Sequence, residues 1–188
     1  LNTSHYTKIP QTRERIFIIG FRDENDFNNK GFLREKSNLC SEAFDFPEKI
    51  DKTKTIKQML TRAQVDEKYY YGESTYFWDE IEENMNSRDT VYQWRRKYIR
   101  ENKSNLCPTL TANMGMGGHN VPLVLDRTGQ RRKLTPKECF KFQGFDKIKI
   151  PNISDSSLYK QAGNSVTVPL ITKIAQSIKV ALDKRYLT

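Results

Sequence analysis

Residues 159–182 read YKQAGNSVTVPLITKIAQSIKVAL and place a Gly-Asn-Ser sequence directly before a periodic apolar stretch. The apolar positions recur at helical spacing, at Val168, Ile171, Ile174, Ala175, Ile178 and Leu182. We therefore predict a turn at residues 163–165 that opens an amphipathic helix. Such a helix must bury its apolar face, and the sequence shows no obvious partner for it.

A second apolar stretch lies near the opposite end, in IPQTRERIFIIGFR at residues 9–22. Residues 16–19 are β-branched and aromatic and are followed by Gly20, which predicts a strand buried on both faces. Arg13 and Arg15 alternate with other residues, so an extended backbone places both guanidinium groups on one face. Spacing alone favours solvated surface charges over a shared site, because charge pairs are common on surfaces.

The 188-residue chain has a net charge of +9, which indicates either a polyanionic partner such as nucleic acid or simply high solubility. Cys40, Cys107 and Cys139 are scattered and form no CxxC pair, so neither a disulfide framework nor a metal site is expected. No membrane-spanning run or signal peptide is evident, so we expect a cytoplasmic location without a membrane partner. Because the chain begins with Leu1, we also expect a piece of something longer.

The middle of the chain combines aromatic rings with two blocks of opposite charge. The acidic block covers residues 79–83, and the basic block contains Arg95, Arg96, Lys97 and Arg100. Basic residues interleaved with aromatic rings are typical of a nucleic-acid surface. Most of the rings are nevertheless expected to fill a core. Composition changes near Phe46, where we place a domain boundary.

Several shorter elements are also predicted. Residues 55–62 suit a helix, residues 109–111 and 121–125 suit strands, and residues 146–158 suit a polar connection. Gly115 suits a close turn or a close backbone approach to a partner, and the isolated His119 suits a hydrogen bond within a turn. Thr135, Pro136 and Glu138 form the pattern of a capping box, which predicts a helix that ends at Gly144.

Three stretches, in this order, resemble the last conserved blocks of the bacterial DNA (cytosine-5) methyltransferases. IPQTRERIFIIGFR resembles the block with Pro-Gln, two arginines and a strand. RKLTPKECFKFQGF resembles the Arg-x-Leu-Thr-x-x-Glu block that ends in Gln-Gly-Phe, and YKQAGNSV resembles the Gly-Asn-Ser-Val block. Lys141 stands where the family usually has Arg, and Asp146 replaces a common Pro. The family's early blocks, with the cofactor loop, the nucleophilic cysteine and an acid, have no counterpart in this sequence.

The resemblance implies an α/β fold. It would combine the edge of a Rossmann-like, S-adenosylmethionine-dependent methyltransferase sheet with a small mixed α+β target-recognition domain. Residues 1–45 would supply C-terminal strands of the catalytic domain, and residues 46–150 would form the DNA-binding recognition domain with its scaffold helix. Residues 151–188 would return as a turn and a helix that packs on the catalytic domain.

The resemblance also implies site residues. In the family, a cysteine thiolate adds to carbon 6 of a flipped cytosine, and carbon 5 then takes a methyl group from S-adenosyl-L-methionine. Arg15 corresponds to the arginine at the cytosine carbonyl, Arg13 to one directed at a DNA phosphate, and Gln11 lies at the mouth of the same block. Asn164 and Ser165 correspond to residues that border the cofactor pocket.

For recognition of double-stranded DNA, Thr109 and Leu110 correspond to a pair beside the base-reading residues. Arg95, Arg96 and Arg100 lie just upstream, and we expect Arg96 or Arg100 to contact a guanine. The expected function is the C-terminal half, or a subunit, of a bacterial DNA cytosine-5 methyltransferase that works with an N-terminal catalytic half. The alternative is a non-catalytic, sequence-specific DNA-binding module derived from such an enzyme.

Overall fold

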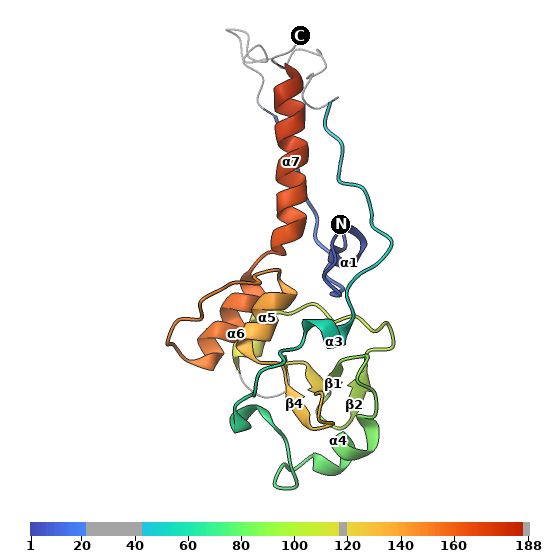
Figure 1. Ribbon diagram of the computed structural model, residues 1–188, viewed down its shortest axis with the longest axis vertical. Helices are drawn as coiled ribbons and strands as arrows, with labels where there is room; N and C mark the ends of the chain where they lie inside the picture. The colour runs from blue at the N-terminus through green and yellow to red at the C-terminus, as the bar shows by residue number, and fades with distance from the viewer. Residues whose placement is uncertain (22–42, 117–119, 186–188) are drawn as a thin grey trace.

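The structure, a computed structural model, describes residues 1–21, 43–116 and 120–185. Helix α7 (Val168–Arg185) extends from a body that holds the sheet and the other long helices (Figure 1). Helix α1 (Thr3–Tyr6) lies beside the base of α7, close to the N-terminus. The expectations for Cys40 and His119 concern positions outside the described residues. No helix in the described ranges is long and apolar enough to cross a membrane.

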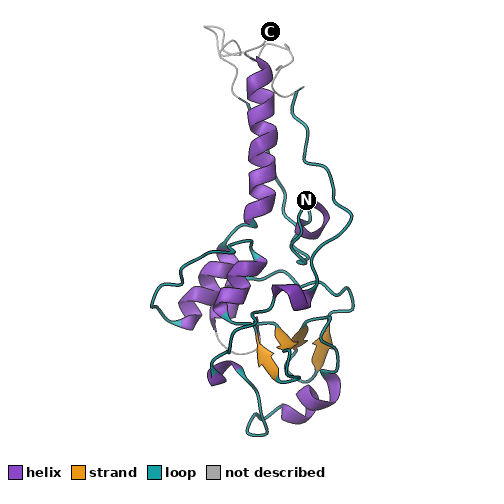
Figure 2. Cartoon of the chain, in the orientation of Figure 1, coloured by secondary structure: helices purple, strands orange, loops and turns teal. Residues whose placement is uncertain are grey.

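The body contains a four-stranded antiparallel sheet in the order β2-β1-β3-β4 (Figure 2). Its strands are β1 (Tyr92–Trp94), β2 (Ile99–Glu101), β3 (Leu123–Leu125) and β4 (Arg131–Lys133). Strand β3 confirms the strand predicted at residues 121–125. The strand predicted at residues 109–111 is wrong: this stretch is irregular, and short 3₁₀ turns occur at η1 (Glu67–Tyr69) and η2 (Ala112–Met116).

Each face of the sheet covers a separate core. On one face, Tyr92 and Trp94 pack with Ile81 and Met85 at helix α4 (Trp78–Asn84). The other core contains Val91 and Val124 together with residues of helices α3 (Ile56–Met59), α5 (Pro136–Phe142) and α6 (Asp155–Asn164). This larger core also includes Ile9, Leu110 and Ala162. Residues 1–45, 46–150 and 151–188 thus all contribute to it.

Both predicted helices form, and each begins with a capping box, although only the box at Thr135 was predicted. Thr55 and Gln58 form a reciprocal capping box at α3, and Thr135 and Glu138 form another at α5. A cap of this kind stabilises a helix by about 1 kcal/mol. After α5, Gly144 has a φ of +87°, a conformation that glycine adopts without strain and that ends the helix as predicted. Helix α3 is shorter than predicted, since it ends at Met59.

The Gly-Asn-Ser sequence is not the turn that we predicted. Gly163 and Asn164 form the end of helix α6, which begins within the stretch expected to be a polar connection. Ser154 caps this helix by accepting a hydrogen bond from the Ser157 amide, and Leu158 and Tyr159 are buried on its inner face. The break before α7 therefore falls at residues 165–167. Helix α7 itself is confirmed, with Leu170 and Ile174 buried.

The predicted strand at residues 16–19 is also wrong within this chain. These residues have no assigned strand structure, and the side chains of Ile16 and Ile18 are 90% and 92% exposed. The physical reason is that no strand among the described residues lies alongside to pair with this segment. The mixed α/β class is nevertheless correct, while the Rossmann-like sheet edge remains a prediction.

Candidate functional site

Arg13 joins three distant parts of the chain. Its side chain is only 6% exposed, and Nη1 donates to the Leu110 carbonyl at 2.7 Å. Nη2 donates to the carbonyls of Gly163 at 3.2 Å and Ser165 at 2.8 Å. The guanidinium thus ties the N-terminal segment to the segment around Leu110 and to the end of α6. This position favours a structural role over the phosphate contact that the resemblance implied.

The charge on Arg13 is stabilised by hydrogen bonds to neutral carbonyls, which do not cancel it. Burial, together with the nearby cation of Arg15, lowers its pKa to about 10. Among the described residues, no carboxylate forms an ion pair with Arg13. The two arginines therefore leave an excess of positive charge here, which favours an anionic or strongly polarised ligand group.

The Gly-Asn-Ser sequence lies in direct contact with the segment that follows Leu110, through Gly163 and Thr111. A Cβ atom added at Gly163 would lie 2.1 Å from the Thr111 carbonyl carbon and 2.4 Å from the Ala112 nitrogen. Gly115, in η2, is also tightly packed against α6. A Cβ atom added at Gly115 would lie 2.5 Å from the Ser156 carbonyl oxygen. The close backbone approach at Gly115 is thus made within the chain, while the approach to a partner stays a prediction. The glycine of Gly-Asn-Ser serves packing between α6 and η2 rather than a turn.

Gln11 and Thr109 complete this junction. Gln11 is fully buried, pairs with Cys107 in a parallel bridge and donates through Nε2 to the Phe142 carbonyl at 3.4 Å. Thr109 Oγ1 donates to the Thr12 carbonyl at 2.6 Å. Leu110 is 1% exposed and lies in the larger core, so it anchors the segment instead of facing DNA itself. The buried Oε1 of Gln11 has no hydrogen-bond partner among the described residues.

Arg15 lies at the edge of a hollow of about 280 Å³. Asn164, Ser165 and Val166 line this hollow from the end of α6, and Phe17 and Thr167 also contribute to it. Arg15 and Asn164 are exposed, so the hollow opens to the surface beside a guanidinium and an amide. The structure thus brings together Arg15, Asn164 and Ser165, which the sequence places at opposite ends of the chain.

Sequence reasoning missed a second group of buried polar residues beneath this hollow. The hydroxyls of Thr3 and Thr167 lie 3.1 Å apart, and Thr167 Oγ1 donates to Gln143 Oε1 at 3.2 Å. Gln143 Nε2 in turn donates to the Ala162 carbonyl at 3.0 Å. Gln143 belongs to the Gln-Gly-Phe sequence, which was the available signal. Its network links α1, α5 and α6, so it fixes the floor of the site.

The scaffold helix α5 is held by a buried ion pair. Arg132 donates to both carboxylate oxygens of Glu138 at 2.8 Å, and both side chains are almost fully buried. Glu138 also accepts from the amides of Thr61 and Thr135. Lys141 donates to the Gln58 carbonyl at 3.1 Å. Burial, together with the nearby cation of Lys54, lowers the pKa of Lys141.

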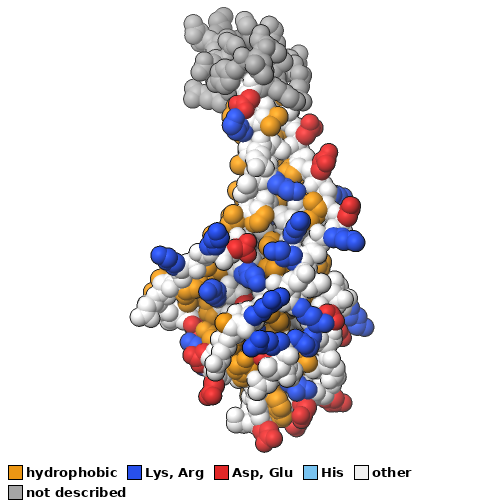
Figure 3. Space-filling model, viewed as in Figure 1, with side chains coloured by type: hydrophobic (Ala, Val, Ile, Leu, Met, Phe, Trp, Pro, Cys, Tyr) orange, Lys and Arg blue, Asp and Glu red, His pale blue; other side chains and the backbone are white. Residues whose placement is uncertain are grey.

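The predicted DNA-binding arginines lie on the β1–β2 hairpin, away from the hollow. Arg95, Arg96 and Arg100 are all exposed, and the tip carries Arg96 in a left-handed conformation with φ of +62°. Lys and Arg side chains gather across the middle of the face shown in Figure 3, while Asp and Glu side chains gather toward its lower end.

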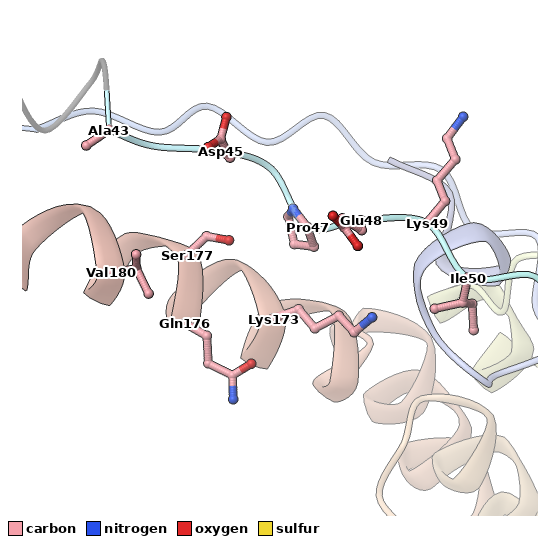
Figure 4. A pocket seen from close by; sticks show the side chains of 10 residues that line it. All are labelled: Ala43, Asp45, Pro47, Glu48, Lys49, Ile50, Lys173, Gln176, Ser177 and Val180. Carbon is pink, nitrogen blue, oxygen red and sulfur yellow. The ribbon is translucent and has the colours of Figure 1, made fainter. Parts of the chain in front are cut away.

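Neither the pocket beside α7 nor the two described cysteines belong to the predicted site. A pocket of about 420 Å³ lies between α7 and residues 43–50 (Figure 4), but none of the predicted site residues lines it. Cys107 and Cys139 are buried, and burial raises the pKa of both thiols, which keeps them protonated and unreactive. Their complete burial fits a structural role for these two cysteines. Among the described residues, no group of side chains has the composition of a metal site.

Comparison with known proteins identifies the family. Residues 1–180 match the C-5 cytosine-specific DNA methylase family, so the chain belongs to that family. It is 49% identical over 181 residues to the type II methyltransferase M.Bsp6I of Bacillus sp. (strain RFL6), covering 95% of this chain and 53% of that protein. It is also 33% identical over 179 residues to M.DsaV of Dactylococcopsis salina, covering 93% of this chain and 45% of that protein.

A likeness in fold accompanies the likeness in sequence. The crystal structure of the S. pombe Dnmt2 methyltransferase superposes with a TM-score of 0.51 at 15% identity, covering 100% of this chain and 56% of that chain. The chain thus spans about half the length of the curated relatives it matches.

Proposed function

We propose that this chain is the C-terminal half or subunit of a bacterial DNA cytosine-5 methyltransferase, which transfers a methyl group to carbon 5 of a flipped cytosine. The observation that carries the proposal is the meeting of Arg15 with Asn164 and Ser165 around one hollow. These residues match two separate blocks of the family, and the fold places them together.

In this proposal Arg15 binds the carbonyl oxygen of the target cytosine. A thiolate that adds to carbon 6 pushes negative charge toward that oxygen, and a fixed guanidinium stabilises the charge. Arg13 acts indirectly, because its three hydrogen bonds hold the backbone on which Arg15 and Ser165 stand. The thiolate would come from residues outside this sequence, because Cys107 and Cys139 are buried and the resemblance places no nucleophile block at Cys40.

The residues around the hollow fit one wall of a site for S-adenosyl-L-methionine. Asn164 and Ser165 provide an amide and a hydroxyl for polar groups, while Phe17 and Val166 provide apolar contact. When bound, the cofactor supplies the methyl group. This chain's share is to orient the cofactor beside the cytosine and to keep water from one side of the site.

The proposed partner is the N-terminal catalytic half of the same enzyme. Ile16 and Ile18 expose two large apolar side chains on an extended segment, which suits packing beside a strand of that half. Matched relatives about twice as long support this assignment of the partner. Residues 46–150 would then read the DNA site, and the small antiparallel sheet with its basic hairpin supports that role.

The test is to mix this chain with the N-terminal half of M.Bsp6I and duplex DNA, and to measure transfer of labelled methyl groups. We expect transfer with the mixture and none with either part alone. Site-specific DNA binding by a correctly assembled mixture that transfers no methyl group would support the alternative, a non-catalytic recognition module. Methyl transfer by this chain alone would contradict the division of the site between two parts.

A further inference from the structure

The β1–β2 hairpin presents a defined set of polar side chains on one face. In the antiparallel register, Gln93 lies directly opposite Arg100, and Trp94 lies opposite Ile99. Side chains alternate between the faces of a strand, so Gln93, Arg95 and Arg100 share one face and Trp94 and Ile99 share the other. The hairpin therefore has an apolar face that is buried in the smaller core. Its polar side chains lie on the side of the sheet that carries the larger core, where Gln93 is half-buried and Arg95 and Arg100 are exposed.

The apolar face fixes the position of the hairpin. Trp94 and Ile99 are buried in the smaller core with Ile81 and Met85 at helix α4. The Arg95 amide donates to the Tyr98 carbonyl at 2.9 Å, which closes a tight turn at the tip. The polar side chains are thus carried on a rigid ribbon rather than on a loose loop.

Gln93 orients one of the two arginines. Arg95 Nη2 donates to Gln93 Oε1 at 2.9 Å, which holds the guanidinium along the face that Arg100 shares. Among the described residues, no side-chain hydrogen bond or ion pair is found for Arg100 or Arg96. An oriented guanidinium loses less conformational freedom on binding and presents its remaining donors in a fixed direction.

The positive charge on the polar face of the hairpin favours a polyanionic partner. The acidic residues of α4, including Asp79, Glu80 and Glu83, belong to the helix that covers the opposite face of the sheet. The ribbon thus separates an acidic side from a basic side. B-DNA has a major groove that admits a two-stranded β-ribbon, and arginine pairs with guanine O6 and N7 there.

From these observations we propose that Gln93, Arg95 and Arg100 form the base-reading face of this chain, with the ribbon inserted in the major groove. Arg95 and Arg100 each read a guanine, and Gln93 is a positioning residue for Arg95. Arg96 and Lys97, at the tip, contact phosphates. This inference rests on the proposed recognition function of residues 46–150, and it names which side chains carry the specificity.

The experiment selects duplexes from a DNA pool with a randomised central segment, using this chain assembled with the N-terminal half of M.Bsp6I, and sequences the bound fraction. We expect Arg95→Ala and Arg100→Ala each to relax the preference at one base pair by about 10-fold or more. Gln93→Ala should relax the same base pair as Arg95→Ala. The double variant Gln93→Ala/Arg95→Ala should be no worse than Arg95→Ala alone, because Gln93 acts only through Arg95.

The matched controls are Arg96→Ala and Lys97→Ala at the tip of the same hairpin. They should weaken binding to all duplexes alike and reduce the dependence of log affinity on log salt concentration by about 1 each. Circular dichroism of every variant, compared with the wild type, confirms that the fold is retained before binding is compared.

The outcomes separate this inference from the proposed function. If the wild type enriches a sequence but Arg95→Ala and Arg100→Ala keep that sequence and only lower affinity, the inference is overturned while recognition stands. If Gln93→Ala relaxes a different base pair from Arg95→Ala, its positioning role is overturned. If the wild type enriches no sequence at all, the recognition function fails and the inference fails with it.

Discussion

Gly163 lies directly against the backbone of Thr111, where a Cβ atom at position 163 would come within 2.2 Å of the Thr111 carbonyl oxygen. This contact joins the last turn of α6 to the segment that begins with Thr109 and Leu110. Arg13 bridges the same two segments through its guanidinium. In the proposed enzyme, the residues beside the target cytosine and the segment around Leu110 of the recognition domain are thus held in one rigid junction.

Gly163→Ala should destabilise the chain, because the new methyl group would meet backbone atoms that cannot move aside as a flexible side chain would. We expect a loss of about 3 kcal/mol in the free energy of unfolding, measured by urea denaturation. Gly72→Ala is the matched control, since nothing lies within 4 Å of its added Cβ. A control change within about 0.5 kcal/mol is expected. Equal stability of Gly163→Ala and wild type would contradict the packing described for this junction.

Arg13→Ala should also destabilise the chain, by about 3 kcal/mol, because the Leu110 and Gly163 carbonyls would lose a charged donor inside the fold. Arg13→Lys should recover only part of this loss, since an ammonium group cannot span the same carbonyls as a planar guanidinium. Urea denaturation measures both. Arg127→Ala, at an exposed position, controls for the removal of one positive charge. Full recovery by Arg13→Lys would show that charge alone matters at this position.

Glu138→Gln should cost about 3 to 5 kcal/mol of unfolding free energy, because it leaves the buried guanidinium of Arg132 without its carboxylate. The exposed pair Lys57 and Asp89, 2.7 Å apart, provides the comparison. Lys57→Ala should cost no more than about 1 kcal/mol, because solvent screens an exposed pair. Similar losses for Glu138→Gln and Lys57→Ala would contradict the burial of the Arg132 pair.

Tyr69 should make stability depend on alkaline pH. Burial and its hydrogen bond to Asp155 raise the pKa of Tyr69 from 10.0 to about 12. The folded state therefore favours the protonated phenol, and this contribution is present below pH 10 and lost as the pH rises through about 12. Tyr69→Phe should remove that part of the pH dependence, measured as unfolding free energy between these pH values. An unchanged dependence in the variant would assign it to other groups.

The sequence predicted those features whose partners are close along the chain. The capping box at Thr135 and the helix end at Gly144 depend on neighbours within a few residues, and both form as expected. The spacing of apolar residues in α7 was likewise sufficient to predict that helix.

Features with distant partners could not be predicted in this way. The resemblance implies a phosphate contact for Arg13. Its hydrogen-bond acceptors in the structure, at Leu110, Gly163 and Ser165, are far away in the sequence, so these bonds could not be predicted. The sequence predicts a turn at Gly163, but glycine suits a turn and a close packing contact equally well. The residue type alone does not distinguish the two. Ile16 and Ile18 have the composition of a buried strand, but a strand also needs a neighbour, and composition does not reveal whether one is present.

The most direct test of the proposed site is the rate of methyl transfer by the reconstituted enzyme when Arg15 is changed. If Arg15 stabilises charge on the cytosine carbonyl, Arg15→Ala should lower kcat by about 100-fold or more while DNA affinity changes little, and Arg15→Lys should restore part of the rate. Arg127→Ala should leave the rate unchanged. An Arg15→Ala enzyme with the wild-type kcat would contradict the central claim that this hollow is part of the methyl-transfer site.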